Sequence, residues 1–263
     1  MATDQRPTER PAQPPPVRRS ALESIHRRLS GSGSTQAQQW PMSYGDPDGE
    51  RATIATSIGL GEPGLFDKLR VCGPGALAEA RVAGLRAERG RIAPADDIAG
   101  VNVWAIADDE LLLLVFAPPP GSPIEQVVSL PALTSSLAGE GVAVTDVSSG
   151  WSVLRLVGPR VRSLLEELVV SDLSTDAVED LEILQVTIAN CRVLLARRDH
   201  GVLPGFTLLV ARDEAEHLWD VLVERGAADD LKPVGGLALI PDGALRGAGV
   251  AAASSDSSAD GAR

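Results

Sequence analysis

The feature of this sequence that most constrains its fold is a short unit that occurs twice. In each copy an apolar strand pattern runs into Gly-Pro and then into a helical pattern, over residues 69–88 and again over residues 154–169. Glycine and proline at such a junction end the strand and begin the helix. Because hairpins, and no long βαβ alternation, connect the units, the pattern predicts an α+β fold with antiparallel sheets, helices packed on one face, and two similar strand–helix halves. Such a repetition is typical of an internal duplication.

The other elements follow from hydrophobic periodicity and turn residues. A hairpin is predicted from residues 101–107 and 110–117, which flank the turn-forming pair Asp108-Asp109. Extended chain is predicted over residues 50–57, and a glycine-rich turn over residues 59–64. The remaining predictions are strands at 142–147, 152–157, 181–187, 191–197 and 206–210, and helices at 21–29, 124–137 and 214–225. Ser20 and Glu23 have the capping-box spacing for the first of these helices.

Both ends of the chain have low-complexity composition. We expect a disordered Pro/Arg-rich tail over residues 1–19, one folded body over residues 20–247, and a disordered Ala/Ser/Asp tail over residues 248–263. Neither tail has enough apolar side chains to offset its chain entropy. The start lacks the apolar stretch of a signal peptide, and the longest apolar run, residues 111–120, is half the length of a membrane span. The sequence therefore predicts a cytoplasmic protein without membrane insertion.

Charge and cysteine content argue against several classes of function. A formal net charge of −12 disfavours nucleic-acid binding, which needs clustered Lys and Arg, and docking on anionic membranes. The two cysteines, Cys72 and Cys191, lie in apolar strand-like runs, so we expect two buried thiols and no disulfide framework. No CxxC or Cys/His cluster indicates a metal site, and no nucleophile-elbow pattern supports hydrolase chemistry.

Several segments occur in the order shown by one known family. The longest, residues 58–76, contains a glycine-rich turn with Glu62 in an acidic position, then a strand and a Gly-Pro helix start. The other matching pieces are His26, Trp40-Pro41, Tyr44 and Glu50 upstream, and residues 145–148, 154–160, 216–222, 233–238 and Leu245-Arg246 downstream. Together they resemble the folate-binding domain of the glycine-cleavage T-protein (aminomethyltransferase) family in a truncated form. The chain is also similar to the gamma subunit of sarcosine oxidase.

The resemblance implies a folate-dependent one-carbon transferase that moves an aminomethyl or methyl group, with tetrahydrofolate as cofactor and an altered cofactor pocket. The alternative is a non-catalytic small subunit or binding protein of a larger oxidase or one-carbon complex, like the sarcosine oxidase gamma subunit. In the first case the partner is the small-molecule folate. In the second it is a larger protein, an oxidase or a one-carbon enzyme.

The loop at residues 197–206 bears on cofactor recognition. A reduced folate requires a carboxylate for its aminopyrimidine donors, a flat wall for the pterin and an arginine for its glutamate tail. In the family a loop after a strand supplies the carboxylate. Matched on Gly205-Phe206, the glutamate position holds Leu203 and the tyrosine position holds His200. Because leucine accepts no hydrogen bond, the sequence predicts altered folate recognition, unless Asp199 substitutes from a shifted loop.

The resemblance also indicates a catalytic aspartate and further binding residues. The family's catalytic aspartate lies before a strand, and Asp96 and Asp97 precede the predicted strand at 101–107; a solvated acidic turn is the alternative. The family's C-terminal arginine falls on Leu239, and Arg246 matches a later one. The residues assigned to cofactor binding are Tyr44, Trp104, Trp151, Arg197, Asp199, His200 and Arg246. For the two tryptophans, a packed core ring is the alternative to a pterin-stacking wall.

Overall fold

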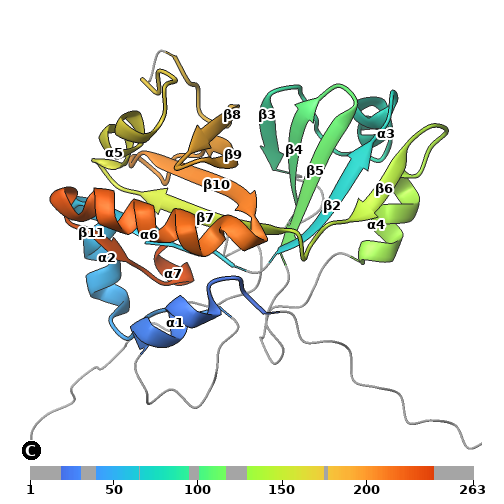
Figure 1. Ribbon diagram of the computed structural model, residues 1–263. Coiled ribbons are helices and arrows are strands. Elements are labelled where there is room, and N and C mark those ends of the chain that lie inside the picture. Colours follow the sequence, from blue (N-terminus) through green and yellow to red (C-terminus); the bar gives the residue numbers. More distant parts are fainter. Residues whose placement is uncertain are drawn as a thin grey trace, which may run out of the picture.

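The computed structural model describes residues 19–30, 40–64, 66–94, 101–116, 129–174 and 177–239 (Figure 1). Apart from Arg19, the predicted tails at 1–19 and 248–263 lie outside this part of the chain. Among the residues that are described, no helix has the length and apolar character needed to cross a membrane.

Two sheets form the body of the protein (Figure 1). The six-stranded sheet has the order β11–β1–β7–β10–β9–β8 and is antiparallel except for the parallel pair β1 and β11. Its strands are β1 Ile58–Gly61, β7 Trp151–Val157, β8 Ile183–Ile188, β9 Cys191–Arg197, β10 Gly205–Ala211 and β11 Leu231–Pro233. The five-stranded sheet, β3–β4–β5–β2–β6, is antiparallel throughout. Its strands are β2 Phe66–Cys72, β3 Arg91–Pro94, β4 Val101–Ala107, β5 Glu110–Phe116 and β6 Ala143–Asp146, and β4 with β5 confirms the predicted hairpin.

Helices cover one face of each sheet, because alternate strand residues point to opposite sides. Along β7, Leu154 and Leu156 face a core shared with α5 and α6, and Val153 faces the other way. In the five-stranded sheet, Leu69 and Val71 face a core shared with α3 and α4. The helices are α1 Glu23–Ser30, α2 Pro47–Thr56, α3 Ala76–Val82, α4 Leu130–Leu137, α5 Val161–Leu168, α6 Ala215–Gly226 and α7 Gly236–Leu239, with the 3-10 turns η1 Arg212–Glu214 and η2 Ala227–Asp229. The predicted α+β architecture is confirmed.

The other faces of the two sheets meet in a third apolar cluster. Trp104 of the five-stranded sheet packs there with Val153 and Leu209 of the six-stranded sheet. The edge strands β3 and β8 also approach each other, where the Ile92 amide donates a hydrogen bond of 2.7 Å to the Leu181 carbonyl oxygen. The layers therefore run helix, sheet, sheet, helix.

The two halves of the chain follow the same path. The first runs β2–α3–β3–β4–β5–α4, and the second runs β7–α5–β8–β9–β10–α6. Within the sheets, β3–β4–β5–β2 corresponds to β8–β9–β10–β7. The chain passes between the sheets twice, from β1 to β2 and from β6 to β7. The Gly-Pro unit seen twice in the sequence thus marks equivalent places in one repeated topology.

The glycine of each unit is required by its backbone conformation and by close contact. Gly73 has φ of +141°, and a Cβ added to it would lie 2.0 Å from the Gly141 carbonyl oxygen. Gly158 has φ of +144°, and an added Cβ would lie 1.9 Å from the Ser57 carbonyl oxygen. A neighbouring backbone therefore occupies the place of a side chain at both positions.

The prediction of extended chain over residues 50–57 is wrong, since the helix α2 covers all of them except Ser57. Asp46 caps this helix by accepting a hydrogen bond of 3.0 Å from the Gly49 amide, and Pro47 occupies its first position. An aspartate followed by proline is a typical helix start, and this signal in the sequence was missed.

The predicted glycine-rich turn at 59–64 is also wrong at its beginning, which belongs to strand β1. A Cβ on Gly59 would lie 2.4 Å from Ile54 Cγ2, and one on Gly61 would lie 2.2 Å from the Val234 carbonyl oxygen. These glycines allow α2 and the segment after β11 to pack closely on the strand, so their role is packing and no turn forms there.

Gly158→Ala is expected to lower the free energy of unfolding by ~3 kcal/mol or more, because it adds a backbone clash to an unfavourable φ. Gly84→Ala is the matched control, with φ of +80° and no atom within 4 Å of an added Cβ. The control should lose only the ~1–2 kcal/mol of left-handed strain. Urea unfolding measures both, and equal losses would argue against the close contact at Gly158.

Leu156→Ala is expected to lower the free energy of unfolding by ~2–5 kcal/mol, through lost burial and a cavity. Leu156 is fully buried and lies between Leu60 and Phe206 on the neighbouring strands. Val170→Ala is the control, because Val170 is fully exposed and should change stability by less than ~0.5 kcal/mol. A nearly neutral Leu156→Ala would show that this face of β7 is not packed as described.

Candidate functional site

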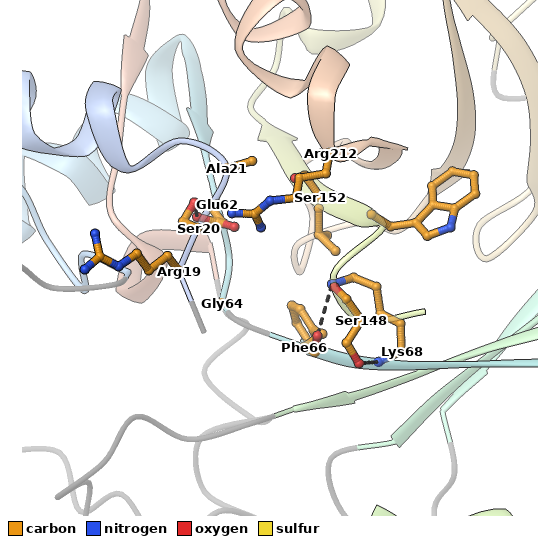
Figure 2. Close-up of a pocket in the computed structure, with 12 residues that line it drawn as sticks. Arg19, Ser20, Ala21, Glu62, Gly64, Phe66, Lys68, Ser148, Ser152 and Arg212 are labelled. Carbon is orange, nitrogen blue, oxygen red and sulfur yellow. Dashed lines mark hydrogen bonds between the residues drawn. The ribbon is translucent and has the colours of Figure 1, made fainter. Parts of the chain in front are cut away.

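A pocket lies where the chain passes between the sheets, beside the β1–β2 and β6–β7 connections (Figure 2). We call it the crossing pocket and define it by Arg19, Glu62, Phe66, Lys68, Trp151 and Arg212. Its volume is about 280 Å³, including space open to solvent.

The crossing pocket has an excess of positive charge, although the whole chain carries −12. Its charged side chains are Arg19, Lys68, Arg212 and Glu62. Lys68 is buried, and its Nζ donates hydrogen bonds to the carbonyl oxygens of Phe66 (3.0 Å) and Ser148 (3.4 Å). Phe66 and Trp151 also line the pocket and add apolar surface. Cationic groups beside aromatic rings form a suitable environment for an anion attached to an apolar group.

A buried hydrogen-bond network lies behind Glu62. Glu62 Oε2 accepts a hydrogen bond of 2.6 Å from Ser20 Oγ and lies 2.9 Å from His26 Nε2. On the far side of the ring, His26 Nδ1 lies 2.8 Å from the Tyr44 hydroxyl. The Trp40 indole donates to the Glu62 carbonyl oxygen at 2.7 Å. His26 and Glu62 are 3% and 5% exposed, so this network holds the pocket carboxylate rigidly from inside the protein.

A second carboxylate anchors the Tyr44 end of the network. Glu50 Oε1 accepts from the Tyr44 amide (2.7 Å) and Ser43 Oγ (2.9 Å), and Oε2 accepts from the Gly235 amide (2.8 Å). Burial, and then the charges of Glu62 and Glu50, raise the pKa of the Tyr44 hydroxyl above its usual 10.0. Tyr44 therefore keeps its proton well into the alkaline range.

The end of β9 and the loop that leads to β10 hold three residues predicted to bind the cofactor, which are Arg197, Asp199 and His200. Asp199 accepts from Arg197 Nε at 3.1 Å through one oxygen and from Arg197 Nη2 at 2.7 Å through the other. This hydrogen bonding raises the pKa of Arg197. The Asp199 amide donates to Asp180 Oδ1 at 2.8 Å, and backbone hydrogen bonds between His200 and Leu203 close the turn. Arg197 and Asp199 thus form an ion pair in which both carboxylate oxygens accept hydrogen bonds from the guanidinium.

The two positions where the resemblance places polar anchors lie in one apolar cluster. Leu239 is fully buried there, and Leu203 packs against the same cluster. The other members are Ile54, Val157, Val234 and Ala238. Leu203 and Leu239, the two departures from the family pattern, therefore belong to the same apolar cluster.

The remaining predicted residues do not converge on one site. Trp151 lines the crossing pocket, and Tyr44 lies behind it in the buried network. Trp104 is 2% exposed in the layer between the sheets, where it makes a core contact. Asp96, Asp97 and Arg246 lie outside the described residues.

Sequence reasoning missed several polar residues that the structure brings to these places. Lys68 and Arg212 of the crossing pocket were not among the predicted site residues, and neither was Arg155. Lys68 and Arg155 carry a usable signal, since each is a cation within an apolar strand pattern. Arg212 follows β10 with no such signal, so only the folded chain shows that it reaches the pocket.

Within the described residues, no group of three or more His, Cys, Asp or Glu side chains is arranged to hold a metal ion. Cys72 and Cys191 are free thiols, partly buried and buried respectively. The prediction of a buried free thiol is therefore confirmed for Cys191, whereas Cys72 is only partly buried.

Comparison with known proteins shows one family. Residues 101–240, more than half of the chain, match the family model described as the GCVT N-terminal domain. The chain is 29% identical over 231 residues to an aminomethyltransferase of Streptomyces avermitilis, covering 83% of this chain and 60% of that protein. An aminomethyltransferase of Saccharopolyspora erythraea is 25% identical over 231 residues with the same coverage. The chain thus spans about 60% of the length of these relatives.

The chain shares its fold with proteins of known structure. A chain of the heterotetrameric sarcosine oxidase of Corynebacterium sp. U-96 matches with a TM-score of 0.55 and 24% identity, over 73% of this chain and 96% of that chain. The aminomethyltransferase T of the Bartonella henselae glycine cleavage system matches with a TM-score of 0.61 and 16% identity. The match covers 85% of this chain and 61% of that chain. At these identities the likeness concerns the fold.

Tyr44→Phe is expected to reduce the fall in the free energy of unfolding that occurs as the pH rises above 10.0. Because the folded-state pKa of Tyr44 is raised above 10.0, its stabilisation is complete below pH 10.0 and is lost as pH rises towards the folded-state pKa. The native free energy of unfolding should therefore fall more steeply above pH 10.0 than that of the variant. Tyr44 is the single tyrosine of the chain, so tyrosinate absorbance reports on it alone. Ionisation at the usual pKa in the folded protein would contradict this burial.

Proposed function

Because this chain belongs to the GCVT N-terminal domain family, we propose that it is a folate-domain protein that acts as a binding subunit of a larger one-carbon or oxidase complex. In this proposal the chain does not itself transfer a one-carbon group on tetrahydrofolate. A fold can be retained after its original site has changed, since function depends on specific groups placed on that fold.

The observation that carries the proposal is the apolar cluster around Leu203 and Leu239. The resemblance assigns a carboxylate to the first position and a guanidinium to the second. Leucine supplies neither, and a pterin bound there has buried N–H donors without acceptors, at ~1–3 kcal/mol each. Both leucines pack in the same apolar cluster. Replacing one of them with a polar residue therefore leaves the other polar group of the family pattern still missing.

Asp199 does not provide a replacement carboxylate in this arrangement. Both of its oxygens accept hydrogen bonds from Arg197, and the two side chains are only 23% and 12% exposed. Turning Asp199 towards a ligand breaks a charge-assisted pair and leaves Arg197 without its carboxylate. The geometry of the loop therefore supports altered folate recognition.

A subunit role draws further support from the sarcosine oxidase structure. A folded unit matched over 96% of its length occurs there as one chain of a heterotetramer. A protein with this fold can therefore serve within a multi-chain enzyme. By analogy, we propose a larger oxidase or one-carbon enzyme as the partner.

The identity to the Streptomyces avermitilis aminomethyltransferase favours a second candidate, an active one-carbon transferase with a rearranged tetrahydrofolate site. The crossing pocket offers Glu62 as a carboxylate, Trp151 as a flat wall and Arg212 as a cation, the kinds of group that a folate needs. In that case Asp96 and Asp97 supply the catalytic carboxylate, as the resemblance implies.

Titration with tetrahydrofolate separates the two candidates. Under our proposal, calorimetry should show binding at least roughly tenfold weaker than that of the Streptomyces avermitilis aminomethyltransferase, because ~1–3 kcal/mol is lost for each unpaired donor. If this protein binds tetrahydrofolate as tightly as that aminomethyltransferase does, the proposal is wrong and the transferase candidate is favoured.

Two variants locate any binding that is observed. Asp199→Asn should leave the heat of titration unchanged if Asp199 stays with Arg197, and should abolish it if Asp199 is a relocated anchor. Arg212→Gln reports on the crossing pocket in the same way. For the subunit role, purification from the source organism should yield a stoichiometric complex with an oxidase or one-carbon enzyme, whereas a solitary chain would count against it.

A further inference from the structure

Arg155 is a cation placed inside the protein. It lies in the middle of β7, opposite Gly61 of β1 and Thr207 of β10. Side-chain alternation puts it on the same face as Val153, towards the layer between the sheets. Its side chain is 4% exposed. Arginine at such a depth is normally paired with a carboxylate.

Within the described residues, the hydrogen bonds of Arg155 are with neutral acceptors. Nη1 donates to Thr207 Oγ1 at 3.0 Å, and Nη2 donates to the Arg198 carbonyl oxygen at 3.1 Å. The third donor, Nε, is buried and has no hydrogen-bond partner among the described residues. None of the ion pairs formed within the described chain includes Arg155. Within the part of the chain that the structure describes, the guanidinium is thus held in position without a direct ion-pair partner.

A second guanidinium adds to the positive charge. Arg198 donates to Asn102 Oδ1 at 3.0 Å, which is again a neutral acceptor. The acidic groups that act on Arg155 are Asp180 and Asp199, and both have other partners: Asp180 accepts from the Asp199 amide, and Asp199 pairs with Arg197. Burial and the charge of Arg198 lower the pKa of Arg155 to about 9, so it remains a cation at neutral pH.

An isolated buried charge is strongly destabilising, whereas the same charge beside an anion is stabilised by charge-assisted hydrogen bonds. Gly205 allows the backbone to pack directly beside this group, because a Cβ there would lie 3.3 Å from Arg155 Nη2 and 2.4 Å from the Arg198 carbonyl oxygen. The arrangement therefore has the charge and donors of an anion site.

We propose that Arg155 and Arg198 form an anion-binding site between the two sheets, and that its ligand is a small molecule bearing a carboxylate. The planar guanidinium fork matches a carboxylate, and the free Nε donor is available to it. A singly charged anion is favoured over phosphate because Asp180 and Asp199 contribute negative potential nearby. The proposal is independent of the role suggested above, since it concerns neither Leu203 nor Leu239.

The test compares sodium acetate, sodium phosphate and sodium chloride at equal ionic strength, with the midpoint of thermal unfolding as the readout. Acetate should raise the native midpoint saturably and by more than chloride, because a ligand that binds the folded state stabilises it by mass action. Arg155→Met should lose this acetate-specific shift. Arg192→Met, a change at an exposed arginine on β9, is the matched control and should retain it.

Two further measurements keep the test decisive if Arg155→Met does not fold. Arg155→Lys keeps a charge without the fork and should weaken acetate binding by roughly tenfold. Calorimetric titration of the native protein with acetate should show saturable heat. If acetate and chloride have equal effects on the native protein, or if phosphate alone stabilises it, the proposed carboxylate site is wrong. Retention of the acetate shift by Arg155→Met would likewise remove Arg155 from the site.

Discussion

The helix-covered core and the candidate sites both depend on the alternation of side chains along β7. Leu154 and Leu156 face the core beneath α5 and α6, and the intervening residues face the opposite side. On that second side the strand contributes in turn Trp151 to the crossing pocket, Val153 to the layer between the sheets, and Arg155 to the buried cation pair. One extended strand at the centre of its sheet therefore sets the depth and order of the candidate sites, and a shift of one residue would exchange core and sites.

Charge is distributed unevenly between surface and interior. The chain carries −12 overall, yet the crossing pocket contains three cationic side chains, and Arg155 with Arg198 adds positive charge between the sheets. The interior carboxylates Glu50 and Glu62 are occupied by backbone, hydroxyl and imidazole groups. Anionic ligands are consequently the class that both regions can attract, and the negative surface does not reveal this preference.

Sequence comparison found the departures at Leu203 and Leu239 but not their connection. In the structure both belong to one apolar cluster, so the loss of one polar group is matched by the loss of the other. Arg197 and Asp199 were predicted as separate binding residues, and they pair with each other. The residues of a site can be proposed from a motif, whereas their mutual contacts depend on loop geometry that periodicity does not contain.

The sequence by itself determined the α+β class, the hairpin of β4 and β5, and the Gly-Pro junctions, because alternation and local turn chemistry act over a few residues. Gly59 and Gly61 were wrongly predicted to form a turn. Glycine is required at these positions because Ile54 and Val234 pack against the strand, and these residues approach it only in the folded chain. The tertiary structure alone decided that Arg212 reaches the crossing pocket and that Arg155 pairs with no carboxylate among the described residues. Burial and charge pairing depend on which distant segments meet, and these contacts are made only when the two sheets pack together.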